Sequence, residues 1–155
     1  MHSDGTTEEH TEAGSERAFN VFDRACPSRP TLEHVTGKWG SLTLSALSSG
    51  TLRFNEVRRR VDGISEKMLS QTLRALERDG LVYRSAQPGN PPWVDYTLTE
   101  PGEAIAARLL DLIDLVQRQM PQVLAARNRY DTGRTVESGG AELADTLEHK
   151  ATRTT

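Results

Sequence analysis

Residues 65–80 read SEKMLSQTLRALERDG, and this stretch decides the fold that the sequence predicts. Leu69, Leu73 and Leu76 recur at spacings of four and three, so they fall on one face of an amphipathic helix. Ser65 stands where a helix-capping hydroxyl is expected. Because a helix with a continuous apolar face must bury that face, we expect the segment to pack on a hydrophobic core.

Three further helices are predicted before this stretch. Apolar residues at helical spacing indicate a short helix and a longer one, interrupted at Gly37, with the buried face formed by Leu32, Val35, Trp39, Leu42, Ala46 and Leu47. After a short extended piece at 51–53, the run FNEVRRRV predicts a third helix with Asn55 as its cap. The turn at Asp62-Gly63 ends this helix and leads into the stretch above.

Gly80 is expected to end the helix in 65–80 by adopting a left-handed conformation. A hairpin and a long helix are predicted after it. LVYRSA and WVDYTLT are rich in β-branched and aromatic residues, and the turn-forming QPGNPP separates them. Thr99 is expected to cap the last helix, and Pro121 is expected to bend or break it. The predicted fold is therefore mainly α with a small β-hairpin (α+β), a winged helix-turn-helix with a long C-terminal helix.

Composition limits this fold to the middle of the chain. Only 35% of the 155 residues are hydrophobic, and core formers are sparse at both ends. We therefore expect a mostly disordered acidic tail at 1–25, one folded domain at 26–131 and a disordered tail at 132–155. No apolar run is long enough to span a bilayer and the first residues do not form a secretory signal, which is typical of a soluble cytoplasmic protein.

The charge distribution allows nucleic acid as a partner although the net charge is -3. Residues 1–25 hold six acidic and two basic side chains, whereas residues 53–84 hold five acidic and eight basic ones. Binding to phosphate depends on the local potential and not on the total, so a basic centre with an acidic tail remains compatible with double-stranded DNA.

A stripe of hydrogen-bond donors lies opposite the leucine face of the helix in 65–80. In a helix-turn-helix the second helix enters the major groove, so its exposed face should carry donors. The residues nearest its amino end, which we expect at base edges, are Lys67, Ser70 and Gln71. The residues expected on phosphates are Arg53, Arg58, Arg59, Arg74 and Arg78. A solvated polar face is the alternative interpretation of this stripe.

Two neighbouring features leave alternatives open. Glu66 either accepts a hydrogen bond from cytosine or serves as a first-turn residue that favours the helix dipole, and we favour the second. Arg58, Arg59 and Arg60 cannot all face the same way, so we expect one of them to lie over the edge of the core.

The predicted wing has a tip without a basic residue. Asn90 and Trp93 are the wing residues that we expect near DNA, and Arg84 is the nearest cation. Insertion into the minor groove is therefore not expected, and packing of the proline-rich, aromatic tip on sugars is the alternative.

Three segments together resemble the HxlR-type family of bacterial winged-helix regulators. They are CPSRPTLEHVTGKW, then LRFNEVRRRVDGISEKMLSQTLRALERDGLVYR, then PPWVDYTLTEPG, in this order and spacing. The chain departs from the family at Trp93, where a basic residue usually follows the paired prolines. The resemblance implies a homodimer on a palindromic operator, and we expect the interface at the coiled-coil-like seam Ile105, Leu109, Leu112 and Val116.

Cys26 matches the cysteine that some members of this family use as a redox or electrophile sensor. Arg24 and Arg29 would lower the pKa of its thiol, and Asp23 would raise it. A small packed residue without reactivity is the alternative that we favour. Because the sequence holds no second cysteine, oxidation would give an intersubunit disulfide, a mixed disulfide or a sulfenic acid.

The function expected from these features is that of a DNA-binding transcriptional regulator, with a repressor as the preferred form and a small-molecule effector as a further partner to consider. A protein-interaction module without DNA binding is the alternative. An enzyme is not expected, because His34 and Cys26 are the one histidine and the one thiol of residues 26–131 and no paired carboxylates form a motif. We expect no cofactor, no metal site and no membrane partner.

Overall fold

The computed structural model describes the backbone of residues 19–151 and the side chains of residues 19–135. The chain divides into two compact units, Met1–Leu109 and Leu110–Thr155. The expected acidic tail lies mostly outside the described residues. Among the helices that the structure describes, none has both the length and the apolar character needed to cross a bilayer.

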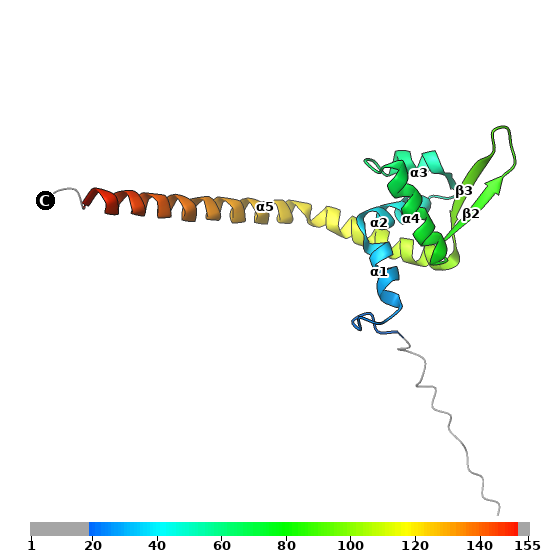
Figure 1. Ribbon diagram of the computed structural model, residues 1–155, viewed down its shortest axis with the longest axis horizontal. Helices are drawn as coiled ribbons and strands as arrows, with labels where there is room; N and C mark the ends of the chain where they lie inside the picture. Colours follow the sequence, from blue (N-terminus) through cyan, green and yellow to red (C-terminus); the bar gives the residue numbers. More distant parts are fainter. Residues whose placement is uncertain (1–18, 152–155) are drawn as a thin grey trace, which may run out of the picture. The chain divides into compact units, whose positions relative to one another are not determined.

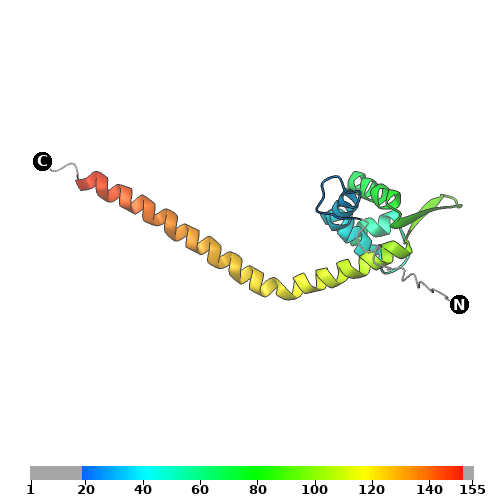
Figure 2. The same ribbon diagram turned by 90° about the horizontal axis from the view of Figure 1, so that it is seen from below.

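The first unit is a winged helix-turn-helix, as the sequence predicts. Its elements in chain order are α1 (Ser28–Thr36), α2 (Lys38–Leu47), β1 (Leu52–Arg53), α3 (Phe54–Arg60), α4 (Glu66–Arg78), β2 (Val82–Gln87) and β3 (Trp93–Leu98). Strands β2 and β3 form the predicted hairpin, which projects away from helices α1 to α4 (Figures 1 and 2). The short extended piece before α3 pairs with β3, so the hairpin becomes an antiparallel sheet in the order β1-β3-β2.

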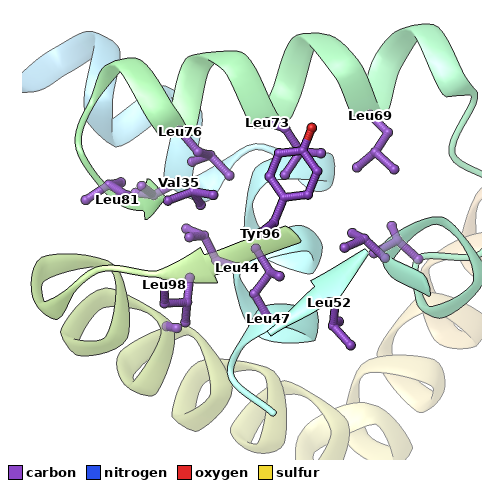
Figure 3. Close-up of a cluster of buried hydrophobic side chains, with 14 of the residues drawn as sticks. Val35, Leu44, Leu47, Leu52, Leu69, Leu73, Leu76, Leu81, Tyr96 and Leu98 are labelled. Atoms are coloured by element: carbon purple, nitrogen blue, oxygen red, sulfur yellow. The ribbon is translucent and has the colours of Figure 1, made fainter. Parts of the chain in front are cut away.

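The leucine face of α4 forms one side of the core and points towards residues of α2 and the sheet (Figure 3). Leu69, Leu73 and Leu76 are at most 2% exposed, as predicted, and they share one buried cluster with Leu44 and Leu47 of α2. Full burial of a leucine contributes about 1.5–3 kcal/mol to folding. The orientation of α4 is therefore set by its apolar side.

The predicted inner face of α1 and α2 was wrong at two positions. Leu32 and Leu42 are 44% and 38% exposed, whereas Leu44 is fully buried. The inner face of α2 includes Gly40 and Thr43, which a search for apolar residues does not count. At Gly40 a Cβ atom would lie 1.7 Å from the carbonyl oxygen of His34, so the two helices meet backbone to backbone.

Capping hydrogen bonds define the starts of α3 and α4, and a left-handed glycine defines the end of α4. The Met68 N–H donates to Oγ of Ser65 at 3.1 Å, and Gly80 after α4 has φ +71°, so both predicted ends of α4 are confirmed. The predicted Asn55 cap was wrong, because α3 begins at Phe54 and its N-cap is Arg53, two residues before Asn55. The backbone N–H of Arg53 donates instead to the Glu56 carboxylate at 2.7 Å.

Helix α5 (Glu100–Ala151) begins in the first unit, where it is tied to the end of α4. The Thr99 hydroxyl donates to the Gly80 carbonyl at 2.6 Å and accepts from the Gly102 N–H at 3.2 Å, which confirms the predicted cap. The backbone N–H of Thr99 also donates to the Leu81 carbonyl oxygen. A Cβ on Gly102 would lie 2.0 Å from that oxygen, so this contact requires glycine.

The later part of α5 differs from what the sequence predicts. Of the two outcomes expected at Pro121, a bend or a break, the break does not occur, because α5 continues past this residue. The helix reaches Ala151, within the segment 132–155 for which composition predicts disorder. An interior proline removes one backbone hydrogen bond and either kinks or breaks a helix, and at Pro121 the helix is not broken. Composition measures the ability to form a core, whereas extending an existing helix adds one hydrogen bond for each residue fixed.

Candidate nucleic-acid interface

The donor stripe of α4 is on the surface of the first unit. Lys67, Gln71, Arg74 and Arg78 are exposed, and Ser70 is half-buried. These side chains are opposite Leu69, Leu73 and Leu76, which the core holds. Burial of one face therefore presents the other face, with its ammonium, amide and guanidinium donors, to solvent.

The amino end of this stripe carries an ion pair that the sequence did not predict. Nη1 of Arg58, in the last turn of α3, lies 2.7 Å from Oε1 of Glu66, the first residue of α4. Both side chains remain accessible, at 44% for Arg58 and 69% for Glu66. The two residues are eight apart across a turn, so helical spacing gave no signal for the pair.

The other two arginines of α3 point to different surroundings. Arg60 donates to the Ala46 carbonyl at 3.3 Å and to the Ser49 hydroxyl, and is thus the arginine that lies over the edge of the core. Arg59 is exposed and lines two hollows, one at the turn between α3 and α4 and one between α3 and β3. Arg59 is therefore accessible to a ligand on either side.

Trp93 does not extend from the wing but lies folded against it. The Arg53 guanidinium sits 4.4 Å from the centroid of its ring, and the indole N–H donates to Asp95 at 3.4 Å. A Cβ on Gly89 would come within 2.4 Å of the ring, so the hairpin tip closes over the indole. Asn90 is exposed at the tip. Of the two predicted wing residues, only Asn90 is fully open to a partner.

A cleft between α1, α2 and α4 adjoins the donor stripe and was missed by sequence reasoning. Its lining includes Trp39 and Lys38 from α2 and Gln71 and Thr72 from α4. The Lys38 ammonium lies 4.2 Å from the centroid of the Trp39 ring, a cation–π distance. The GKW motif at 37–39 belongs to this lining, but in the sequence it indicated only a resemblance to a family and not that these residues lie beside α4.

The four seam residues of α5 are divided between the two units. Leu109 is 7% exposed and Ile105 packs against the same core, so both are used within the first unit. Leu112 and Val116, in the second unit, are 53% and 50% exposed. The heptad pattern identified the apolar residues, but it did not distinguish those that pack on the core of the same chain from those that remain exposed.

Cys26 and His34 have specific partners. Sγ of Cys26 lies 3.0 Å from Oγ of Ser28, and hydrogen bonds from the Ser28 hydroxyl and backbone N–H lower the pKa of the thiol below its usual value. The charge of Asp23 acts in the opposite direction. Nδ1 of His34 lies 2.6 Å from the carboxylate of Asp79 and so joins α1 to the end of α4.

Comparison with known proteins gives a consistent family assignment. A family model described as HxlR-like helix-turn-helix matches residues 34–124. The chain is 49% identical to the uncharacterised HTH-type transcriptional regulator YtfH of Escherichia coli (strain K12) over 109 residues, which are 70% of this chain and 86% of that protein.

Solved structures agree with this assignment. YtfH from Salmonella typhimurium is 48% identical, with a TM-score of 0.68 over 71% of this chain and 98% of that chain. The oxidised form of the redox regulator HypR is 36% identical, with a TM-score of 0.55 over 60% of this chain and 96% of that chain.

The contact between Cys26 and Ser28 makes a testable prediction about thiol reactivity. Ser28→Ala removes the hydroxyl that stabilises the thiolate, so the pKa of Cys26 should rise and the midpoint of the alkylation rate against pH should move to higher pH. Iodoacetamide kinetics report this site alone, because the chain has one cysteine. Asp23→Asn should move the midpoint the other way, and equal midpoints in wild type and Ser28→Ala would contradict the assignment.

Proposed function

The chain belongs to the HxlR-like helix-turn-helix family of transcriptional regulators, and from this premise we propose that it is a repressor that binds a palindromic operator as a homodimer. The observation that carries the proposal is the exposed donor stripe of α4, which begins at the Ser65 cap and lies beside a β-hairpin. Repression follows where the operator overlaps a promoter.

Within the stripe, position along the helix separates the roles. The amino-terminal residues of a recognition helix contact base edges, so Lys67, Ser70 and Gln71 are assigned to sequence readout. Glutamine pairs with two atoms of adenine at once, and lysine donates to guanine. The exposed positions of Lys67 and Gln71 support this assignment.

Phosphate contacts surround this readout surface. They are assigned to arginines of β1, α3 and α4, namely Arg53, Arg58, Arg59, Arg74 and Arg78. The Arg53 guanidinium is already oriented by the Trp93 ring. Arg58 keeps donors for a phosphate after its bond to Glu66, because a guanidinium has five N–H groups.

Substitutions in α4 should separate readout from phosphate binding. Gln71→Ala should weaken binding to the operator by about 1–3 kcal/mol and relax its sequence preference, while leaving the affinity for random DNA unchanged. Arg78→Ala should weaken both DNAs alike and lower the salt slope by about one. Titrations at several salt concentrations check this. An equal loss on operator and random DNA for Gln71→Ala would remove the readout assignment.

Dimerisation is assigned to the second half of the seam. Leu112 and Val116 are about half exposed in the described structure, and they lie four residues apart on one face of α5. A coiled-coil contact between two copies of α5 would remove this apolar surface from water. Two recognition helices would then bind half-sites about 34–36 Å apart.

A charge in the seam should separate the two copies. Leu112→Glu places a carboxylate in the proposed interface, so the molar mass from light scattering should fall from that of a dimer to that of a monomer. Gln117→Glu adds the same charge outside the seam and should leave the dimer intact. A dimeric Leu112→Glu variant would place the interface elsewhere.

Cys26 supports a response to oxidants. Its pKa is lowered, which favours the thiolate that oxidants attack, and the related HypR is a redox regulator. With one cysteine in the chain, the oxidised product is an intersubunit disulfide, a mixed disulfide or a sulfenic acid.

The redox proposal predicts a difference between wild type and Cys26→Ser. The oxidant diamide should weaken operator binding by the wild type, and reduction with dithiothreitol should restore it, because one reversible thiol reaction controls the effect. Cys26→Ser should bind as the reduced wild type does under both conditions. If diamide has no effect on wild-type binding, the signal is not an oxidant, and a small-molecule effector becomes the candidate to test.

A further inference from the structure

A carboxylate stands at the amino end of the donor stripe of α4. Glu66 is the first residue of the helix and 69% exposed, so it lies where a recognition helix comes closest to base edges. Facing DNA, an unpaired carboxylate would be repelled by the phosphates. The donors assigned to base edges and phosphates give no role to this carboxylate.

The ion pair with Arg58 changes the electrostatics of this carboxylate. The guanidinium belongs to α3 and holds Oε1 of Glu66 at 2.7 Å, which neutralises the charge and restricts the side chain. An exposed ion pair of this kind adds little to folding stability. A carboxylate has about four lone-pair sites, so one bond from Arg58 leaves capacity for another donor.

We propose that Glu66 is a specificity-determining residue that accepts a hydrogen bond from the exocyclic amino group of a cytosine, and that Arg58 is its positioning residue. This inference rests on the proposed function. In the major groove cytosine presents a donor, whereas guanine and thymine present acceptors. Adenine presents a donor beside the N7 acceptor, which would repel a carboxylate. The pair therefore selects cytosine.

The competing account is that Glu66 only favours the helix dipole at the start of α4. That role acts on the helix and not on a base, so its loss would leave the sequence preference unchanged. Glu77 provides a matched control, because it is an exposed glutamate of the same helix near the opposite end. Arg59 is the control for Arg58, since it is the next residue of α3 and exposed.

The experiment selects bound duplexes from a random pool with the full-length wild-type protein and then with each variant. Wild type should return one cytosine per half-site that Glu66→Ala no longer prefers. Operator affinity of Glu66→Ala should fall about tenfold, and its affinity for random DNA should not fall. Glu66→Gln should change the preference at that position from cytosine to adenine, because an amide pairs with adenine. Glu77→Ala should select the wild-type sequence.

The positioning role of Arg58 has its own readout. Arg58→Ala should weaken the cytosine preference at the same position, and Arg58→Lys, which keeps the charge, should restore part of it. Arg59→Ala should lower the affinity for all sequences and leave the cytosine in place. Circular dichroism confirms that each variant is folded.

Three results would overturn parts of this scheme. If Glu66→Ala and Glu77→Ala both select the wild-type sequence, the base contact is wrong while the proposed function stands. If Arg58→Ala lowers all affinities without changing any preference, Arg58 is a phosphate contact and not a positioning residue. If wild type itself enriches no sequence, the proposed function fails.

Discussion

Burial of the leucine face of α4 is the constraint on which the rest of the molecule depends. Leu69, Leu73 and Leu76 are held by the core, and a helix that is fixed on one side has only one possible outer side. The donor stripe needs no separate device to orient it. The same residues that stabilise the fold therefore position the surface assigned to DNA.

Local charge, and not the total, describes this surface. The net charge of the chain is -3, yet α3 and α4 bring arginines and Lys67 to one region of the first unit. The carboxylate of Glu66, at the start of α4, is accompanied by the Arg58 guanidinium of the neighbouring helix. At this position an acidic side chain is thus paired where it would otherwise repel an anionic partner.

The sequence predicted what depends on neighbours along the chain and missed what depends on contacts across space. Helical periodicity located helices α1 to α4, the caps at Ser65 and Thr99 located the starts of α4 and α5, and β-branched and aromatic runs located the hairpin. Helical periodicity placed Leu42 on the buried face of α2 by mistake, because the true inner face of this helix includes Gly40 and Thr43. It also missed the partner of Arg58, since residues on two helices share no period. The predicted roles of individual residues toward DNA remain predictions.

The joint between Thr99, Gly80 and Gly102 has a mechanical consequence. The start of α5 is fastened to the end of α4 by hydrogen bonds on both sides of the Thr99 hydroxyl and by a backbone contact that admits no side chain. A torque applied to the first turn of α5 is therefore passed directly to the end of α4, because these contacts join the two helix ends without passing through the intervening strands β2 and β3.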